Sequence, residues 1–290
     1  MVVQKTWETT SSRPRPSHEA QDGVTIPYTE AFDNGQMYPG DPTGGVDEVA
    51  GCSCIMSIDG TADETPTFES IAQAEDYLAS KYDLGDLTGV QPEDLSTVQD
   101  MIAEVDRIVA QYPALTSDPE WRFLGIGTYE TAGVPGAVLE LGSDAFAVTR
   151  NTTSFGKGPA IWLNTLSEGL LSEGTGMMGE IGFTAEKSAV DAIIHEMGHA
   201  VMAVSDYQRV ERGFLAYRDE IYGAFKSPLG MFMRDTGSIY AGGPRMEEAF
   251  ATVFYRLNAP GGLDGLSKAA IKRLRKLADR LNEWVGMAVL

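Results

Sequence analysis

Two histidines and a glutamate stand together in the second half of the chain, in the run His195-Glu196-Met197-Gly198-His199. A spacing of four residues places both imidazoles on one face of a helix, one turn apart. Neutral imidazole is a good zinc ligand, and catalytic zinc sites combine three protein ligands with a water. Zinc lowers the pKa of that water to about 7, and Glu196 is placed to accept its proton as a general base. The motif predicts zinc-assisted hydrolysis. The alternative interpretation is a pair of ordinary helix histidines.

A third ligand must be a carboxylate, because no histidine follows His199. The sequence offers Asp206, Glu211, Glu247 and Glu248 as candidates. The last two lie in a segment, 245–254, that is typical of a helix with small and aromatic residues facing a core. A carboxylate on a packed helix is held rigidly, as a ligand should be. Spacing alone does not choose among the four.

Tyr240 shortly precedes that segment. A phenol beside a metal can donate a hydrogen bond to the oxyanion that develops during hydrolysis. Most tyrosines near a helix are core or interface residues, so both interpretations stay open on spacing alone.

Hydrophobic spacing indicates the elements that would position these residues. Apolar residues at Val190, Ile194, Met197 and Val201 predict that the histidine motif lies on a helix over about 185–204. Helices are also predicted at 67–82, 92–112, 207–226, 245–257 and 266–285, and strands at 122–127, 137–141, 145–149 and 160–164. The stretch 166–183 has five glycines and no clear period, so we expect a long loop. Strands followed by helices predict an α+β fold.

The strand at 160–164 follows Gly158-Pro159, and proline is tolerated at the start of an edge strand. We therefore expect this strand to be the sheet edge along the cleft, within reach of His195 and Glu196. An extended substrate peptide would add to such an edge. The glycine-rich stretch 166–183 would then serve as a flap over the cleft.

The net charge of −20 is concentrated in residues 1–100, which hold 19 acidic and 4 basic residues. This acidity opposes binding to a phosphate backbone, so no nucleic-acid partner is expected. A basic group within 268–280 has helical spacing and is interpreted as the solvated face of an amphipathic helix. No run of 18 apolar residues exists, so no membrane span is predicted. The N-terminus lacks the apolar core of a signal peptide, so we expect the chain to stay where it is made.

The only two cysteines form Cys52-Ser53-Cys54. A disulfide between residues two apart would be strained, and a reducing compartment fits this usage. Cys52, Cys54 and His18 suggest a small metal site, but a fourth ligand is not evident. We favour a structural role for these three residues.

Residues 120–260 resemble the lethal-factor-type zinc metallopeptidases. The resemblance rests on a strand ending in Asn164, the motif at 195–199, Tyr240, and the run Glu248-Ala249-Phe250-Ala251-Thr252-Val253-Phe254. It implies that Glu248 is the third zinc ligand and that Tyr240 stabilises the oxyanion. It also implies a zincin-like, gluzincin-type fold with a small mixed sheet, the motif helix and C-terminal helices. This chain departs from the family at Thr252, where a second glutamate is usual, and by one extra residue between Tyr240 and Glu248.

Residues 5–54 resemble the C-terminal half of the Mu-F-type minor head proteins of tailed phages. The matching residues are Lys5, Trp7, Arg13, Arg15, His18, Asp22-Gly23, Phe32, Gly35, Pro39-Gly40-Asp41-Pro42, Glu48, Cys52 and Cys54. The N-terminal half of that domain does not precede them. The resemblance implies phage head or portal proteins as partners, and a location in the phage capsid interior or in the host cytoplasm during assembly.

Together these features predict a partial Mu-F-type domain at 1–56, a linker at 57–66, and a zincin-like domain at 67–290 that begins with a helical hairpin. The expected function is a zinc endopeptidase attached to a phage minor head protein, acting on a protein or peptide substrate. One alternative is a structural head component with a non-catalytic zincin scaffold. Another is a protease effector delivered with the phage genome. The presence of Glu196 favours an enzyme, because an inactive scaffold would usually lose the base.

Overall fold

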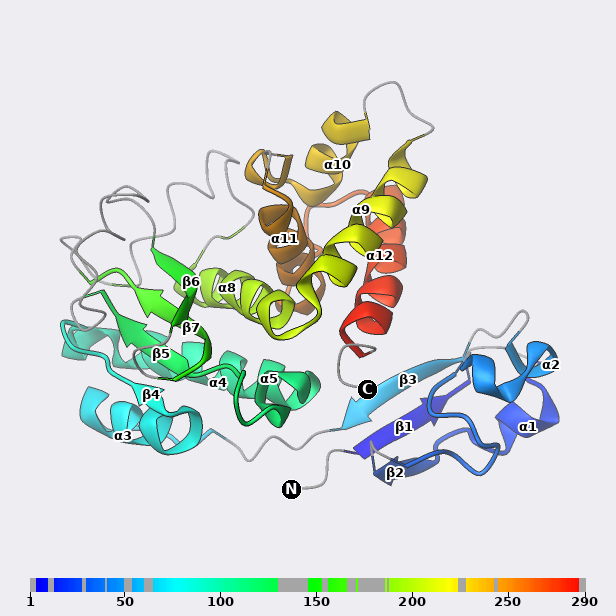
Figure 1. Ribbon diagram of the computed structural model, residues 1–290, viewed down its shortest axis with the longest axis horizontal. Helices are drawn as coiled ribbons and strands as arrows, with labels where there is room; N and C mark the ends of the chain where they lie inside the picture. The colour runs from blue at the N-terminus through cyan, green and yellow to red at the C-terminus, as the bar shows by residue number, and fades with distance from the viewer. Residues whose placement is uncertain are drawn as a thin grey trace. The chain divides into compact units, whose positions relative to one another are not determined.

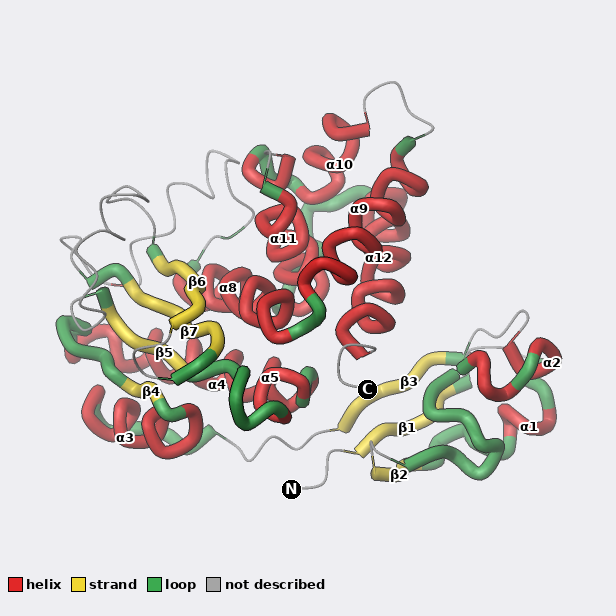
Figure 2. Tube along the Cα trace, in the orientation of Figure 1, coloured by secondary structure: helices red, strands yellow, loops and turns green. Residues whose placement is uncertain are grey.

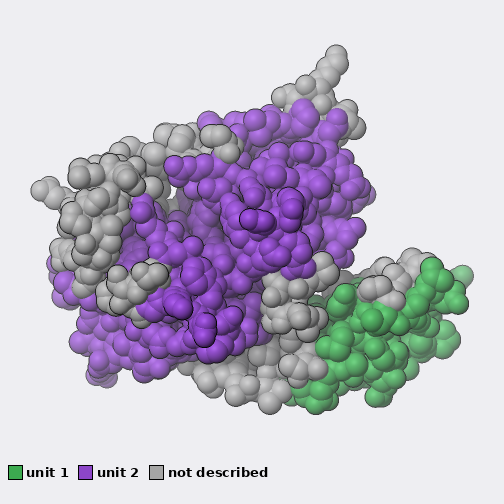
Figure 3. Space-filling view, in the orientation of Figure 1, with its two compact units in different colours: residues 1–65 green, residues 66–290 purple. Residues whose placement is uncertain are grey.

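The structure is a computed structural model of the chain. It describes residues 4–9, 13–27, 30–39, 41–49, 54–59, 65–129, 146–152, 156–165, 171, 186, 188–223, 228–242 and 245–286. The chain divides into two compact units, Met1–Thr65 and Pro66–Leu290 (Figure 3). The linker expected at 57–66 needs one correction, because strand β3 (Ile55–Asp59) occupies its beginning. Those residues pair in a sheet, while 60–64 lie outside the described residues.

The first unit is built on a three-stranded antiparallel sheet of order β2-β1-β3. In it β1 (Gln4–Glu8) lies between β2 (Thr25–Pro27) and β3. The short helices of this unit are α1 (Pro16–Glu19), η1 (Pro42–Gly44) and α2 (Val46–Val49). The fully buried Trp7 packs edge-to-face on Phe32 and His18, at ring-centroid distances of 5.1 and 5.2 Å. Trp7 is thus the centre of a small core, in a unit whose described strands and helices are short.

The second unit contains a four-stranded mixed sheet of order β4-β5-β7-β6. Strands β4 (Leu84–Gly85), β5 (Gly125–Thr128) and β7 (Gly158–Leu163) run parallel, and β6 (Ala147–Thr152) runs antiparallel to β7. Helices make up most of the rest (Figure 2). They are α3 (Ile71–Tyr82), η2 (Pro92–Asp94), α4 (Leu95–Gln111), α5 (Ala114–Ser117), α8 (Ala189–Val204), α9 (Tyr207–Tyr222), α10 (Pro228–Thr236), η4 (Tyr240–Gly242), α11 (Met246–Asn258) and α12 (Lys268–Gly286).

The prediction that strand 160–164 forms the sheet edge is wrong. Strand β7 pairs with β5 on one side and β6 on the other, and all six of its residues are buried. A strand buried on both faces is apolar throughout, which is the pattern of Ala160-Ile161-Trp162-Leu163. Pro159 is tolerated because the ladder uses its carbonyl, which accepts a hydrogen bond from the Leu124 N–H at 2.9 Å. Among the described strands, β6 is the edge on this side of the sheet.

Helix α8 lies between the sheet and the C-terminal helices (Figure 1). It begins at Ser188, whose hydroxyl accepts a hydrogen bond from the Asp191 N–H at 3.1 Å and so caps the helix. The helix packs against β6 and β7 of the sheet and against helices α11 and α4. Ile193, Ile194 and Met197 are fully buried in these contacts. The motif helix is therefore a central, rigid element of the unit.

The α+β class predicted from the sequence is confirmed at this coarse level, because a small mixed sheet is followed by helices. The predicted helices at 67–82, 92–112 and 207–226 are observed with shifted ends, and the strand at 137–141 lies outside the described residues. Helix α10 was not predicted. None of the described helices has the length and apolarity needed to cross a membrane.

Candidate metal centre

Helix α8 presents His195 and His199 on one face, as the spacing predicts. The two rings lie 5.0 Å apart between centroids and meet at 69°. His195 is buried and His199 is half-buried. Both rings turn their Nε2 atoms toward the same carboxylate. The two imidazoles are therefore arranged to bind the same metal ion.

Glu248 provides that carboxylate from the first turn of α11. Its Oε2 atom lies 3.3 Å from Nε2 of His195 and 3.2 Å from Nε2 of His199. The potential ligand atoms of the three residues all lie within 4.8 Å of one another. The buried position of Glu248 raises the pKa of its carboxyl, but hydrogen bonds and charge from the two histidines outweigh burial and hold this pKa well below its usual value. This group can hold a metal ion.

The other carboxylates considered from the sequence do not join this group. Glu247 is half-buried next to Glu248, and Asp206 caps helix α9 by accepting a hydrogen bond from the Arg209 N–H. Glu211 lies on α9. Among the described residues, His195, His199 and Glu248 are the one set of at least three His, Cys, Asp or Glu residues arranged to hold a metal.

At Gly198, helix α11 packs closely against α8. A Cβ atom at this position would lie 2.9 Å from Cα of Ala251 and 3.0 Å from Cβ of Phe254. Real Cβ contacts are almost never this short, so a side chain here would force the two helices apart. Because α8 carries the histidines and α11 carries Glu248, Gly198 sets how closely the ligands can converge.

The variant Gly198→Ala is therefore expected to weaken both folding and metal binding. Overpacking of this kind costs about 1–3 kcal/mol of stability, offset in part by the roughly 1 kcal/mol gain of alanine over glycine in a helix. Denaturant unfolding and metal titration of the same protein would measure both effects. An unchanged metal affinity would show that the helix crossing does not set the ligand geometry.

Glu186 is a functional candidate that the sequence did not reveal. Its Oε1 atom lies 2.7 Å from Nδ1 of His195, on the ring side opposite Glu248. Both residues are buried, and burial alone would lower the pKa of His195. The Glu186 carboxylate outweighs that effect and raises this pKa well above its usual value. A carboxylate on the outer nitrogen of a metal-binding histidine fixes the ring and its tautomer. Glu186 is thus positioned to orient His195.

Replacing Glu186 by glutamine is expected to lower metal affinity about 10–100-fold, the usual cost of losing such a partner. The amide can still hydrogen-bond to the ring but no longer supplies the negative charge. Competition with a fluorescent chelator would measure the change. The exposed Glu220 on α9 offers a matched control, Glu220→Gln, which should bind metal as the parent does. Equal affinity for the two variants would remove Glu186 from the site.

Glu196 lies on α8 beside the ligands. Its Oε2 atom is buried and has no hydrogen-bond partner among the described residues. Burial raises the pKa of this carboxyl, and the nearby His199 and His195 offset only part of the rise. The backbone carbonyl of Glu196 accepts a hydrogen bond from the Thr149 hydroxyl at 2.8 Å, which ties α8 to edge strand β6. Glu196 thus follows His195 on the motif helix, with one carboxylate oxygen buried and with the pKa of its carboxyl above the usual value.

Tyr129, at the end of β5, is a second residue that the sequence did not reveal. Its phenol oxygen is buried without a hydrogen-bond partner among the described residues. Burial and the charge of Glu196 raise its pKa to about 12. The phenol therefore stays protonated at neutral pH, in the electrostatic field of the proposed base.

Tyr240, which we expect near the metal, is the first residue of the short helix η4, just before α11. Its side chain is outside the described residues, so its proposed role stays a prediction.

Comparison of the chain with protein-family models, with curated proteins and with solved structures identified no match.

Proposed function

We propose that the second unit is a zinc-dependent endopeptidase with a zincin-like fold. The observation that carries the proposal is the convergence of His195 and His199 of α8 with Glu248 of α11, next to the buried Glu196 carboxylate. Zinc suits this group because two imidazoles and one carboxylate supply three protein ligands, the number typical of catalytic zinc. The buried Oε2 atom of Glu196 also lacks a partner among the described residues, as expected for a group that acts on a bound water or substrate.

Zinc, when bound, supplies a Lewis acid that makes water acidic enough to attack at neutral pH. Glu196 takes the proton of the attacking water. Its burial favours this role, because a raised pKa brings a carboxylate closer to the pKa of an efficient general base. The same carboxyl then delivers the proton to the leaving amine. Glu186 hydrogen-bonds to Nδ1 of His195, so that Nε2 of the same ring stays directed at the metal position throughout the reaction.

We place the substrate along edge strand β6. An extended peptide can add to an exposed sheet edge through main-chain hydrogen bonds. Strand β6 occupies the edge next to β7, and the contact between Thr149 and Glu196 brings it to the motif helix. This corrects the assignment of the substrate to strand 160–164 and keeps the substrate beside the proposed base.

We also propose that this peptidase is attached to a phage head. The support is the Mu-F-type pattern at 5–54, which makes phage head or portal proteins the proposed partners. The proposed location is the capsid interior or the host cytoplasm during assembly. A protease in that position would process head proteins during maturation or act in the host after injection.

The experiment that tests the proposed activity uses the zinc-loaded full chain and a library of peptides blocked at both ends. Cleavage inside these peptides, detected by mass spectrometry, is the expected result for an endopeptidase. A chelating phenanthroline isomer should stop cleavage, and its non-chelating isomer should not. Cleavage that survives the chelating isomer would show that a metal is not required.

A further inference from the structure

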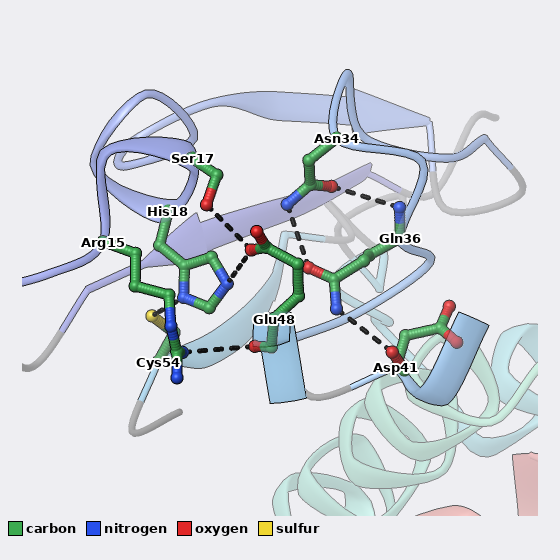
Figure 4. Close-up of polar contacts among 8 residues, drawn as sticks. All are labelled: Arg15, Ser17, His18, Asn34, Gln36, Asp41, Glu48 and Cys54. Atoms are coloured by element: carbon green, nitrogen blue, oxygen red, sulfur yellow. Dashed lines mark hydrogen bonds and ion pairs between the residues drawn. The ribbon is translucent and has the colours of Figure 1, made fainter. Parts of the chain in front are cut away.

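The first unit brings together three side chains with complementary chemistry from three separate segments of the chain. His18 belongs to α1, Glu48 to α2, and Cys54 directly precedes β3. The Sγ atom of Cys54 lies 3.4 Å from Nδ1 of His18, and a Glu48 carboxylate oxygen lies 2.9 Å from Nε2 of the same ring. Figure 4 shows the imidazole between the thiol and the carboxylate.

The histidine and the carboxylate are both held in place. His18 is only 2% exposed, and its ring packs edge-to-face on the buried Trp7. Glu48 accepts a hydrogen bond from the Ser17 hydroxyl at 2.8 Å, and its backbone carbonyl accepts one from the Arg15 guanidinium at 3.3 Å. The imidazole thus has a fixed orientation, with one nitrogen for the thiol and the other for the carboxylate.

This arrangement differs from that of the metal centre in the second unit. There, the ligand atoms of three side chains converge on one position. Here, the thiol and the carboxylate occupy opposite nitrogens of one ring, so Cys54, His18 and Glu48 do not converge on a single ion. The order thiol, imidazole, carboxylate is instead that of a nucleophile, its base, and the group that orients the base.

The surroundings of Cys54 suit a reactive thiol. Cys54 is half-buried and is not in a disulfide. Reactive cysteines are typically partly exposed and next to a histidine or another cationic group, because the thiolate is the nucleophile.

We propose that Cys54 is a nucleophilic thiol activated by His18, which Glu48 orients, and that it forms mixed disulfides with low-molecular-weight disulfides. Nδ1 of His18 accepts the thiol proton, and the Cys54 sulfur attacks one sulfur of the disulfide. A new S–S bond forms as the old one breaks, and the leaving thiolate takes the proton back from His18. The disulfide is the oxidant, and the products are the modified protein and one free thiol.

The chain has two cysteines, so each can be studied alone. In the full chain carrying Cys52→Ser, an aromatic disulfide that releases a coloured thiol reports the reaction rate of Cys54. An unperturbed thiol is only about 3% ionised at pH 7, so a thiol that is fully ionised has far more of the reactive thiolate. The thiolate of a more acidic thiol is a weaker nucleophile, which offsets part of this gain in rate. We therefore expect Cys54 to react about tenfold faster at pH 7 than Cys52 in the Cys54→Ser chain. Adding His18→Gln should remove this advantage.

Because His18 is buried, its replacement could unfold the unit, so two further measurements are needed. Glu48→Gln should slow Cys54 in part, whereas Glu19→Gln, which changes an exposed acid on the same helix as His18, should not. In urea, the rate of Cys54 should fall to that of an ordinary thiol.

Three results would overturn the proposal. The first is a Cys54 rate no higher than that of Cys52. The second is a rate that rises on unfolding, because the fold would then protect the thiol. The third is a rate that rises only after a chelator is added, because Cys54 would then be a metal ligand. The Glu196→Gln variant should leave the Cys54 rate unchanged, so this test is independent of the proposed peptidase activity.

Discussion

Replacement of Glu196 by glutamine is expected to lower kcat/KM for peptide hydrolysis by about 10²–10⁴-fold, the usual contribution of a general base. Glutamine has nearly the same shape as glutamate but cannot accept the proton of the attacking water. The ligand atoms of His195, His199 and Glu248 are untouched by this change. The variant should therefore bind metal as the parent does and lose the chemical step. Kinetics on a cleaved peptide, together with metal content by mass spectrometry, would separate the two.

Glu220→Gln serves as the control here too, since it removes one exposed carboxylate from the same unit and should leave kcat/KM unchanged. If Glu196→Gln cleaves peptide as fast as this control does, another group must act as the base. Loss of metal from Glu196→Gln would indicate a structural rather than a chemical role.

Replacement of Glu248 by glutamine is expected to reduce metal affinity by more than about 100-fold. Loss of a residue that only hydrogen-bonds to a ligand costs roughly 10–100-fold, and loss of a ligand itself should cost more. The carboxylate oxygen within 3.3 Å of both histidines would become part of a neutral amide, a poorer ligand for a dication. Peptidase activity should fall with the bound metal. Metal titration followed by native mass spectrometry would give the affinity of the purified variant.

Glu247→Gln is the matched control for this prediction. The two glutamates are adjacent on α11, but only Glu248 joins the group of converging ligands. Glu247→Gln should bind metal normally. The opposite result, with loss of metal in Glu247→Gln and normal binding in Glu248→Gln, would contradict the assignment of the third ligand.

The histidine pair and its helix could be predicted from the sequence because they depend on local spacing. The apolar stripe through Ile194 and Met197 determines which face of α8 is buried, and the four-residue spacing places both histidines on one face. Glu248 could not be selected in this way. It lies 49 residues after His199, and its position depends on the crossing of α8 and α11 at Gly198. Only the family resemblance favoured it over Glu247.

The role of Glu186 and the central position of strand β7 could not be predicted from the sequence, for different reasons. Glu186 lies just beyond a glycine-rich stretch with no period, so nothing local indicates that its carboxylate meets His195. The sequence predicts strand 160–164 at the sheet edge, because Pro159 is disfavoured in a central strand. The continuous apolar run that follows was the better signal, since it requires burial on both faces.

We propose that this chain hydrolyses peptide bonds with one zinc ion. The most direct test is to titrate the metal-free full chain with zinc while following cleavage of a blocked peptide. The predicted result is that activity rises with added zinc and reaches its plateau at one ion per chain, and that Glu196→Gln stays inactive at every point. Zinc that binds at this stoichiometry without any cleavage of peptides or of phage head proteins would contradict the claim and leave the centre a structural metal site.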